Sequence, residues 1–263
     1  NTPVRAIGFI DEIEKAFSAA GTDTSGTTQD QLQAFLRVMQ DDNIPGIVLL
    51  GPPGTGKSAI AKASGAAAGC PVISFDLGAM KGSLVGESEA RIRAAMAVFK
   101  SVSQGKGLFI ATCNGIAQLP PELRRRFKLG TFFVDFPNAN QRQAIWSIWC
   151  KRFGLSATQP KPSAEDWSGA EIAACCEVAF RCGLSLVEAA SYIVPVAVSA
   201  RDRIQALRRA ASGAYLSASE PGLYRFGTQA AGQEGGRRAF EFDGERTTPE
   251  TPERSNTSCH AGQ

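Results

Sequence analysis

The residues with the most specific chemical spacing in this chain form a short glycine-rich loop. An apolar run at Ile47–Leu50 leads into Gly51–Ser58, which reads GPPGTGKS, and a helical pattern follows. This is the GxxxxGK[ST] spacing in its required strand–loop–helix context. Glycines let backbone N–H groups turn inward and surround phosphate oxygens at the positive end of a helix. The loop therefore predicts a binding site for the phosphates of a nucleotide.

Two side chains of this loop have separate expected roles. Lys57 is expected to bridge the β- and γ-phosphates, and Ser58 is expected to supply a hydroxyl to Mg²⁺. The expected cofactors are accordingly ATP and Mg²⁺. The residues of the loop that we predict to bind the nucleotide are Pro53, Gly54, Thr55, Gly56, Lys57 and Ser58.

Magnesium binding and activation of water also require carboxylates at the end of a neighbouring strand. The apolar run Val4–Ile10 is followed directly by Asp11 and Glu12. Asp11 would join Ser58 as a metal ligand, and Glu12 would polarise the attacking water. From these residues alone an alternative stays open, in which the two acids belong to an exposed strand end that caps the next helix.

The elements that must position these groups alternate between strand and helix over residues 1–137. Strand patterns cover 4–10, 44–50, 71–75, 107–112 and 131–136, and helical patterns cover 28–40, 57–68, 87–101 and 121–127. Such alternation predicts an α/β fold, with a parallel sheet covered by helices on both faces. With the loop, this is the sheet of a P-loop NTPase.

Residues 138–218 show helical periodicity and no strand signal, which predicts a small all-helical lid domain. The helical patterns cover 140–153, 168–182 and 186–212. Gly154 and Gly183 are expected to end the first two helices, and Pro195 is expected to break the third. Trp146, Trp149 and Phe153 lie at helical spacing, so we expect them in the core of this domain.

Residues 219–263 are rich in Gly, Pro, Thr, Arg and Glu with few apolar residues, which predicts a disordered tail.

The whole chain has 263 residues with 28 basic and 25 acidic side chains. The resulting net charge of +3 gives no bulk indication of nucleic-acid binding. No apolar run approaches the roughly 20 residues that span a bilayer, and no signal-peptide pattern opens the chain. A cytoplasmic protein without a membrane partner is expected.

The histidine and cysteine content excludes several kinds of catalysis. The one histidine, His260, lies four residues before the end of the sequence, which argues against Ser-His-Asp and Cys-His catalysis and most zinc sites. The seven cysteines include no CxxC pair and are mostly in apolar surroundings. We interpret them as small, reduced core residues.

The loop and five further segments resemble the AAA+ ATPases, close to the AAA clade itself. The matching segments are FIDE at 9–12 (Walker B strand), LVGESE at 84–89 (pore loop), ATCN at 111–114 (sensor 1), LPPELRRRF at 119–127 (arginine fingers) and SGAEI at 168–172 (start of the lid helix). The resemblance implies an Mg²⁺-dependent ATP hydrolase with a P-loop domain and a helical lid.

The resemblance also implies roles for individual residues. Asn114 would sense the γ-phosphate and help align water, although an asparagine at a strand end is also common in turns. Arg124 and Arg126 would reach the nucleotide of a neighbouring subunit, which requires a homo-oligomer, expected to be a hexamer; a solvated basic helix end is the alternative. Gly169 and Ala170 would pack close to the adenine and ribose, unless they only begin a capped helix.

One segment departs from the family's order along the chain. In the family the Walker B strand lies after the pore-loop helix and before sensor 1. Here that interval, Arg91–Leu108, contains no acidic residue, and the corresponding piece, Ala6–Gln40, precedes the phosphate loop. In one hypothesis this strand–helix unit is transposed in sequence and keeps its place in the sheet. In the other, Asp11 and Glu12 end a separate upstream ATPase. We favour transposition, because each part occurs once, and it predicts that Asp11 lies close to Ser58.

The most complete functional hypothesis is a ring-shaped ATPase that remodels a protein or a protein complex. Leu84 occupies a position where the family usually has an aromatic residue, which weakens the inference of polypeptide threading. Two alternatives remain: an ATP-dependent nucleic-acid loader, and a nucleotide-gated scaffold with little turnover.

Overall fold

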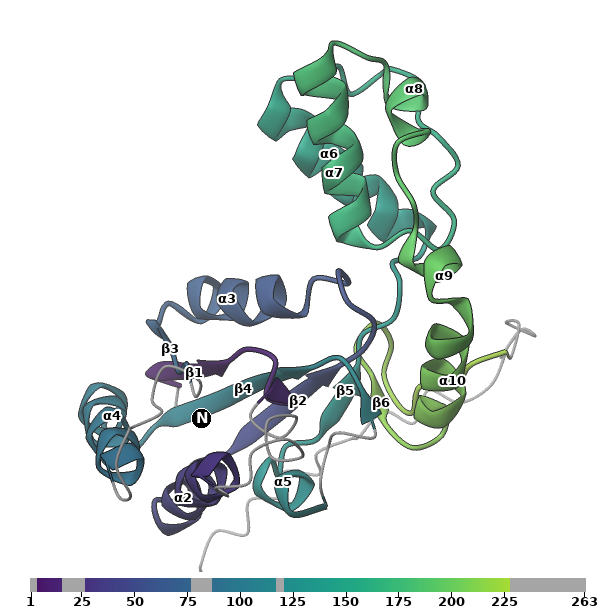
Figure 1. Ribbon diagram of the computed structural model, residues 1–263. Helices are drawn as coiled ribbons and strands as arrows, with labels where there is room; N and C mark the ends of the chain where they lie inside the picture. Colours follow the sequence, from purple (N-terminus) through teal and green to yellow (C-terminus); the bar gives the residue numbers. More distant parts are fainter. Residues whose placement is uncertain (1–3, 16–26, 77–86, 117–120, 228–263) are drawn as a thin grey trace, which may run out of the picture. The chain divides into compact units, whose positions relative to one another are not determined.

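The described part of the chain contains one parallel sheet. The computed structural model describes residues 4–15, 27–76, 87–116 and 121–227. The strands are β1 (Ala6–Ile10), β2 (Gly46–Leu50), β3 (Val72–Ser74), β4 (Gly107–Cys113), β5 (Thr131–Phe133) and β6 (Leu216–Ser217). They lie in the order β3-β1-β4-β2-β5-β6, and every neighbouring pair is parallel (Figure 1). The predicted α/β fold class is confirmed.

Helices cover both faces of this sheet. They are α2 (Thr27–Asp41), α3 (Lys57–Ala68), α4 (Glu87–Ser103) and α5 (Pro121–Arg126). Helix α3 lies on one face, and α2, α4 and α5 lie on the other (Figure 1). Alternate residues of β1 follow this division: Ile7 and Phe9 pack in the cluster that contains Ala61 of α3, whereas Ala6 and Ile10 pack in the opposite cluster. Burial on both faces explains why the strands read as continuous apolar runs.

The helices of the second region are α6 (Ala139–Phe153), α7 (Gly169–Cys182), α8 (Leu186–Ala190), α9 (Val196–Ser199) and α10 (Arg201–Ala211). Gly154 and Gly183 end α6 and α7 in the left-handed conformation, as predicted. The long pattern at 186–212 is three helices rather than one. Pro195 stands at the N-cap of α9, where its missing N–H is tolerated. The helical pattern is therefore interrupted before α9, as expected.

The helical region has its own core, but its C-terminal part joins the sheet. Trp146 is buried in the helical core, as predicted. In contrast, Ala211 of α10 and Tyr215 pack in the core of the sheet, and β6 pairs with β5. The structure therefore differs from the prediction of an all-helical segment as far as residue 218. A two-residue strand is too short to leave a periodic signal.

The predicted disordered tail differs from the structure in its first part. Tyr224 is buried in the sheet's core, and its backbone N–H donates to the carbonyl of Tyr215 at 2.8 Å. Residues 228–263, and the pore-loop segment with Leu84, lie outside the described residues. No helix in the described ranges is both long and apolar enough to cross a bilayer.

Four of the six described cysteines are core residues, as the sequence suggested: Cys113, Cys150, Cys175 and Cys176 are fully buried. Cys70 is half-buried and Cys182 is exposed, so the interpretation is wrong for Cys182. Burial raises the pKa of the Cys175 thiol to about 11 and that of Cys176 to about 12, so both are protonated near neutral pH. Protonated, buried thiols pack as small apolar side chains.

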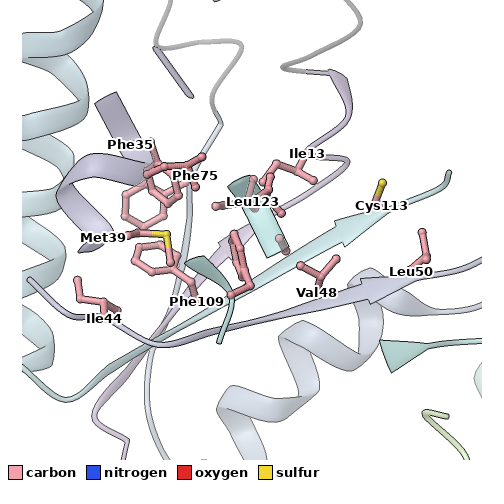
Figure 2. Close-up of a cluster of buried hydrophobic side chains, with 14 of the residues drawn as sticks. Ile13, Phe35, Met39, Ile44, Val48, Leu50, Phe75, Phe109, Cys113 and Leu123 are labelled. Atoms are coloured by element: carbon pink, nitrogen blue, oxygen red, sulfur yellow. The ribbon is translucent and has the colours of Figure 1, made fainter. Parts of the chain in front are cut away.

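An aromatic cluster forms the centre of the core beneath the sheet (Figure 2). The Phe109 ring of β4 lies 5.1 Å from that of Phe35, 5.3 Å from that of Phe75 and 4.7 Å from that of Phe99, measured between centroids. Gly8 of β1 faces the same ring: a Cβ atom built there would lie 2.2 Å from Phe109 Cε1. The interior strand β1 can approach β4 in this way only because residue 8 has no side chain.

This packing predicts that Gly8→Ala lowers the free energy of unfolding by about 1–3 kcal/mol, the usual cost of overfilling a packed core. Urea denaturation measures the change. In the Phe109→Leu background the same substitution is expected to cost much less, since the smaller side chain leaves room. Equal costs in the two backgrounds would show that the ring does not limit residue 8.

Candidate functional site

The glycine-rich loop connects β2 to α3 and buries its lysine. Lys57 is 6% exposed, and its Nζ donates hydrogen bonds to the carbonyls of Gly51 at 3.0 Å and Pro52 at 2.7 Å. Burial lowers the pKa of Lys57 to about 8, and the carboxylate of Glu14 is the strongest opposing influence. The amine is thus held inside the loop by backbone oxygens, where phosphate oxygens would be its stronger partners.

Asp11, at the carboxyl end of β1, lies directly against the loop. Ser58 Oγ donates to Asp11 Oδ1 at 2.7 Å, and Thr112 Oγ1 donates to the same oxygen at 2.6 Å. Strand β1 pairs with β4, and β4 pairs with β2, so parallel pairing gathers the three strand ends at one edge of the sheet. The structure thus meets the geometric condition that the transposition hypothesis set for Asp11 and Ser58.

The same two groups fit Mg²⁺. Hydroxyl and carboxylate oxygens are the donors this ion prefers, and it is commonly held by one or two carboxylates together with substrate phosphates. Within the described ranges, no group of three or more His, Cys, Asp or Glu side chains could hold a metal ion. A site made of Ser58 and Asp11 is therefore suited to an ion that arrives with a nucleotide.

Glu12 and Asn114 face each other beside this pair. Asn114 Nδ2 donates to Glu12 Oε1 at 3.1 Å, and the carboxylate of Glu12 also forms an ion pair with Lys15. Glu12 has a φ of 47°, uncommon for a residue with a side chain, and its backbone N–H donates to Thr112 Oγ1 at 2.8 Å. The Thr112 hydroxyl therefore fixes the turn that directs both acids.

Glu14 is a part of the site that the sequence analysis missed. It is 7% exposed, and its Oε1 accepts the backbone N–H of Asn114 at 3.0 Å. It also acts electrostatically on Lys57. Thr112 was missed as well, because a threonine inside a strand is an ordinary residue for a sheet. Thr112 stands on β4 two residues before Asn114, which directly follows the strand, and this spacing could have placed both side chains on the same side.

The start of α7 contacts the glycine-rich loop from the helical region. The backbone N–H of Ala170 donates to the carbonyl of Gly54 at 3.1 Å. Gly54 has a φ of +76°, and a Cβ atom there would lie 2.8 Å from Ser168 Oγ. Ser168 is the N-cap of α7 in a capping box with Glu171, so the helix start itself is firmly defined. The contact brings Gly169 and Ala170 to the loop.

These groups enclose one cavity of about 550 Å³, within the usual size range of ligand pockets. Its lining residues are Asp11, Glu12, Pro53, Gly54, Thr55, Gly56, Lys57, Ser58, Ala59, Thr112, Asn114, Ile145, Trp149, Gly169 and Ala170. Every residue predicted to bind nucleotide or metal is among them. Trp149 was expected only in the core of the lid; it is half-buried, and with Ile145 it offers an apolar wall to the cavity.

Arg124 and Arg126 are not among the residues that line this cavity. Both lie on α5, and the guanidinium of Arg124 lies 5.3 Å from the centre of the Tyr215 ring. The structure therefore does not bring the predicted arginine fingers to this cavity.

The parallel sheet, the glycine-rich loop and the acidic strand end define a P-loop nucleotide-binding protein. Residues 47–104 match the sequence model described as "ATPase family associated with various cellular activities (AAA)". The matched residues include the glycine-rich loop and helix α3, so this part of the chain is similar to the AAA family.

Similar proteins include two that share the name "Uncharacterized AAA domain-containing protein ycf46". That of Guillardia theta is 28% identical over 147 residues, which is 41% of this chain and 29% of the relative. That of Pyropia yezoensis is 29% identical over 163 residues, 46% of this chain and 33% of the relative. The chain thus spans about a third of the length of these relatives.

Among solved structures, the chain is similar to the FIGL-1 AAA domain, with 16% identity, a TM-score of 0.42 and coverage of 75% of this chain and 95% of that one. It is also similar to the same domain in complex with ADP, with 16% identity, a TM-score of 0.40 and coverage of 70% and 85%. A structure titled "Structural Basis for Katanin Self-Assembly" matches with 21% identity, a TM-score of 0.34 and coverage of 52% and 58%.

The buried lysine leads to a binding prediction. Lys57→Met is expected to raise the dissociation constant for ADP by about 10- to 100-fold, since hydrogen bonds to charged groups contribute about 1.5–3 kcal/mol. Isothermal calorimetry measures it. The matched control is Lys62→Met on the exposed side of α3, which should bind ADP as the wild type does. Equal loss in both variants would contradict a specific role for Lys57.

Proposed function

We propose that this chain hydrolyses ATP with Mg²⁺ as cofactor. The observation that supports this best is the shared contact of Ser58, Asp11 and Thr112 at the edge of the sheet, with Glu12 and Asn114 beside it. A loop that only bound nucleotide would not need a carboxylate against its serine and a second carboxylate in the same cavity.

Each group has a distinct part in this proposal. The backbone N–H groups of the loop and the amine of Lys57 would hold the phosphates, and Ser58 with Asp11 would hold Mg²⁺. When bound there, the ion would supply positive charge to the transferred phosphoryl group. Glu12 accepts a proton from the attacking water, and Asn114 orients that water against the γ-phosphate. Ile145 and Trp149 on one side, and Gly169 and Ala170 on another, surround the base and ribose.

The position of β1 supports the transposition hypothesis as part of this proposal. Strand β1 pairs with β3 on one side and with β4 on the other, so it is an interior strand of this sheet. An acidic segment from a separate upstream ATPase would not be expected between two strands of the unit that carries the loop. We therefore assign Asp11 and Glu12 to the same active site as Lys57.

The sharpest test is Glu12→Gln, which keeps the size and hydrogen-bonding capacity of the side chain but removes the base. Steady-state turnover is expected to fall by at least about 100-fold, because a positioned general base contributes about 10²–10⁴. ATP affinity, measured separately, should stay near the wild-type value. Glu177→Gln, which removes an exposed ion pair with Arg181 on α7, is the control and should leave turnover intact. Wild-type turnover in Glu12→Gln would rule out Glu12 as the base.

We further propose that the active form is a homo-oligomeric ring, expected to be a hexamer, that remodels a protein. Arg124 and Arg126 lie outside their own subunit's cavity, in agreement with a role at a neighbouring site. An arginine supplied in trans stabilises charge in the transition state and raises the rate by about 10³–10⁵.

Mixing of inactive subunits tests the trans role. Arg126→Ala and Lys57→Met are each expected to abolish turnover alone. A mixture should regain part of it, because a Lys57→Met subunit can still give its arginine to the intact loop of an Arg126→Ala neighbour. The same experiment with Arg124→Ala tests the second arginine, and exposed Arg125→Ala is the control that should remain active by itself. Absence of recovery in both mixtures would contradict catalysis across subunits.

A further inference from the structure

A nearly buried arginine lies where the two cavity-forming helices of the second region begin. Arg208 of α10 is 14% exposed at its side chain. Its Nε donates to Asp135 Oδ1 at 2.8 Å, and its Nη2 donates to Asp166 Oδ1 at 3.2 Å. Planar guanidinium groups present several donors in fixed directions, so one arginine can bind two separate carboxylates at once.

The two carboxylates belong to the segments that lead into α6 and α7. Asp135 follows β5 and stands three residues before Asn138, the N-cap of α6. Asp166 stands two residues before Ser168, the N-cap of α7. Helix α6 supplies Ile145 and Trp149 to the cavity, and α7 supplies Gly169 and Ala170. Arg208 therefore joins the segments that precede the two helices that supply residues to the cavity.

Further contacts fix the guanidinium itself. It lies over the ring of Phe136 at 4.9 Å and over that of Phe226 at 5.4 Å, measured to the centroids. The second oxygen of Asp135 accepts a hydrogen bond from Tyr224 Oη at 2.6 Å. The hydrogen bond from Arg208 to Asp135 is thus surrounded by other side chains. The hydrogen bond to Asp166 is more exposed, since the side chain of Asp166 is 54% exposed.

We propose that Arg208 is a positioning residue for nucleotide binding, which acts by holding the start of α7 against the glycine-rich loop through Asp166. This inference rests on the proposed function only for the identity of the ligand. The chain of contacts runs from Arg208 to Asp166, and along the backbone to Ser168 and Ala170, whose N–H donates to Gly54. Loss of the Asp166 contact would free α7 to move away from the loop.

The amide of Ala170 is a direct reporter of this contact. N–H groups in the first turn of a helix have no partner within the helix, so protection of this amide comes from Gly54. The amide of Ile172, which donates to the carbonyl of Ser168 at 3.2 Å, reports the integrity of α7 itself. Faster exchange at Ala170 alone indicates that α7 has moved away from the loop, whereas faster exchange at both amides indicates that α7 itself has loosened. The measurement requires neither nucleotide nor turnover.

The experiment compares amide exchange and ADP binding in the full chain for Asp166→Asn and Arg208→Lys. Arg209→Gln is the matched control, because Arg209 is exposed and bonds only within α10, to Gln205, among the contacts described. In both test variants, Ala170 should exchange several-fold faster while Ile172 is unchanged. The dissociation constant for ADP should rise about twofold to fivefold, in line with a partly exposed charge pair. Arg209→Gln should match the wild type in all three measurements.

Wild-type exchange at Ala170 in both test variants would overturn the inference, and so would equally faster exchange at Ile172, since the helix would then have loosened as a whole. Failure of the proposed ATP hydrolysis would look different. In that case the wild type shows no turnover, while the Ala170 amide still responds to Asp166→Asn and Arg208→Lys.

Discussion

The hydrogen bonds that meet at Asp11 Oδ1 are the interaction on which the rest of the site depends. One carboxylate oxygen accepts from Ser58 of α3 and from Thr112 of β4, so three separate segments meet at one atom. Such an arrangement requires β1 to lie beside β4. It also requires the glycine-rich loop to begin two strand positions from β1, at the end of β2, which lies beside β4. The geometry of the site therefore depends directly on the order of β1, β4 and β2 in the sheet.

Packing in the core holds β1 in its place beside β4. Because Gly8 lacks a side chain, the Phe109 ring can fill the space under β1, and the aromatic cluster around it packs α2 and α4 against the sheet. Strand β1 is therefore held by two ladders of hydrogen bonds and by its fit to one ring. A carboxylate that is to hold an ion beside a serine has to be fixed to within a fraction of an ångström, and loops fix side chains less well than strands do. Placing Asp11 at the end of an interior strand meets that requirement.

Much of this could be predicted from the sequence, because the signals are local. The spacing of Gly51–Ser58 requires a particular loop, and glycines at 154 and 183 end helices by their own conformational freedom. Long apolar runs predict strands buried on both faces. Other features were not predictable, since they depend on contacts between distant segments. The pairing of β6 with β5 involves two residues, and the burial of Tyr224 depends on where Asp135 lies. Thr112 and Glu14 belong to the site only because β1 and β4 are neighbours.

Trp149 shows why the helical wall was also only partly predicted. Helical spacing correctly placed Trp146 in the core, but spacing alone cannot say which side of a helix meets another part of the molecule. That side is set by the segments leading into α6 and α7, and Arg208 holds both of them. Since α10 follows α7 in the chain yet contributes Ala211 to the core of the sheet, it connects the helical wall to the sheet from which Asp11 and the glycine-rich loop extend. A ligand bound in the cavity would contact both the loop and the start of α7, so its binding and their contact must influence each other. The order of the segments along the chain is unimportant for this, because the parallel strands bring their carboxyl ends to one edge whichever strand comes first.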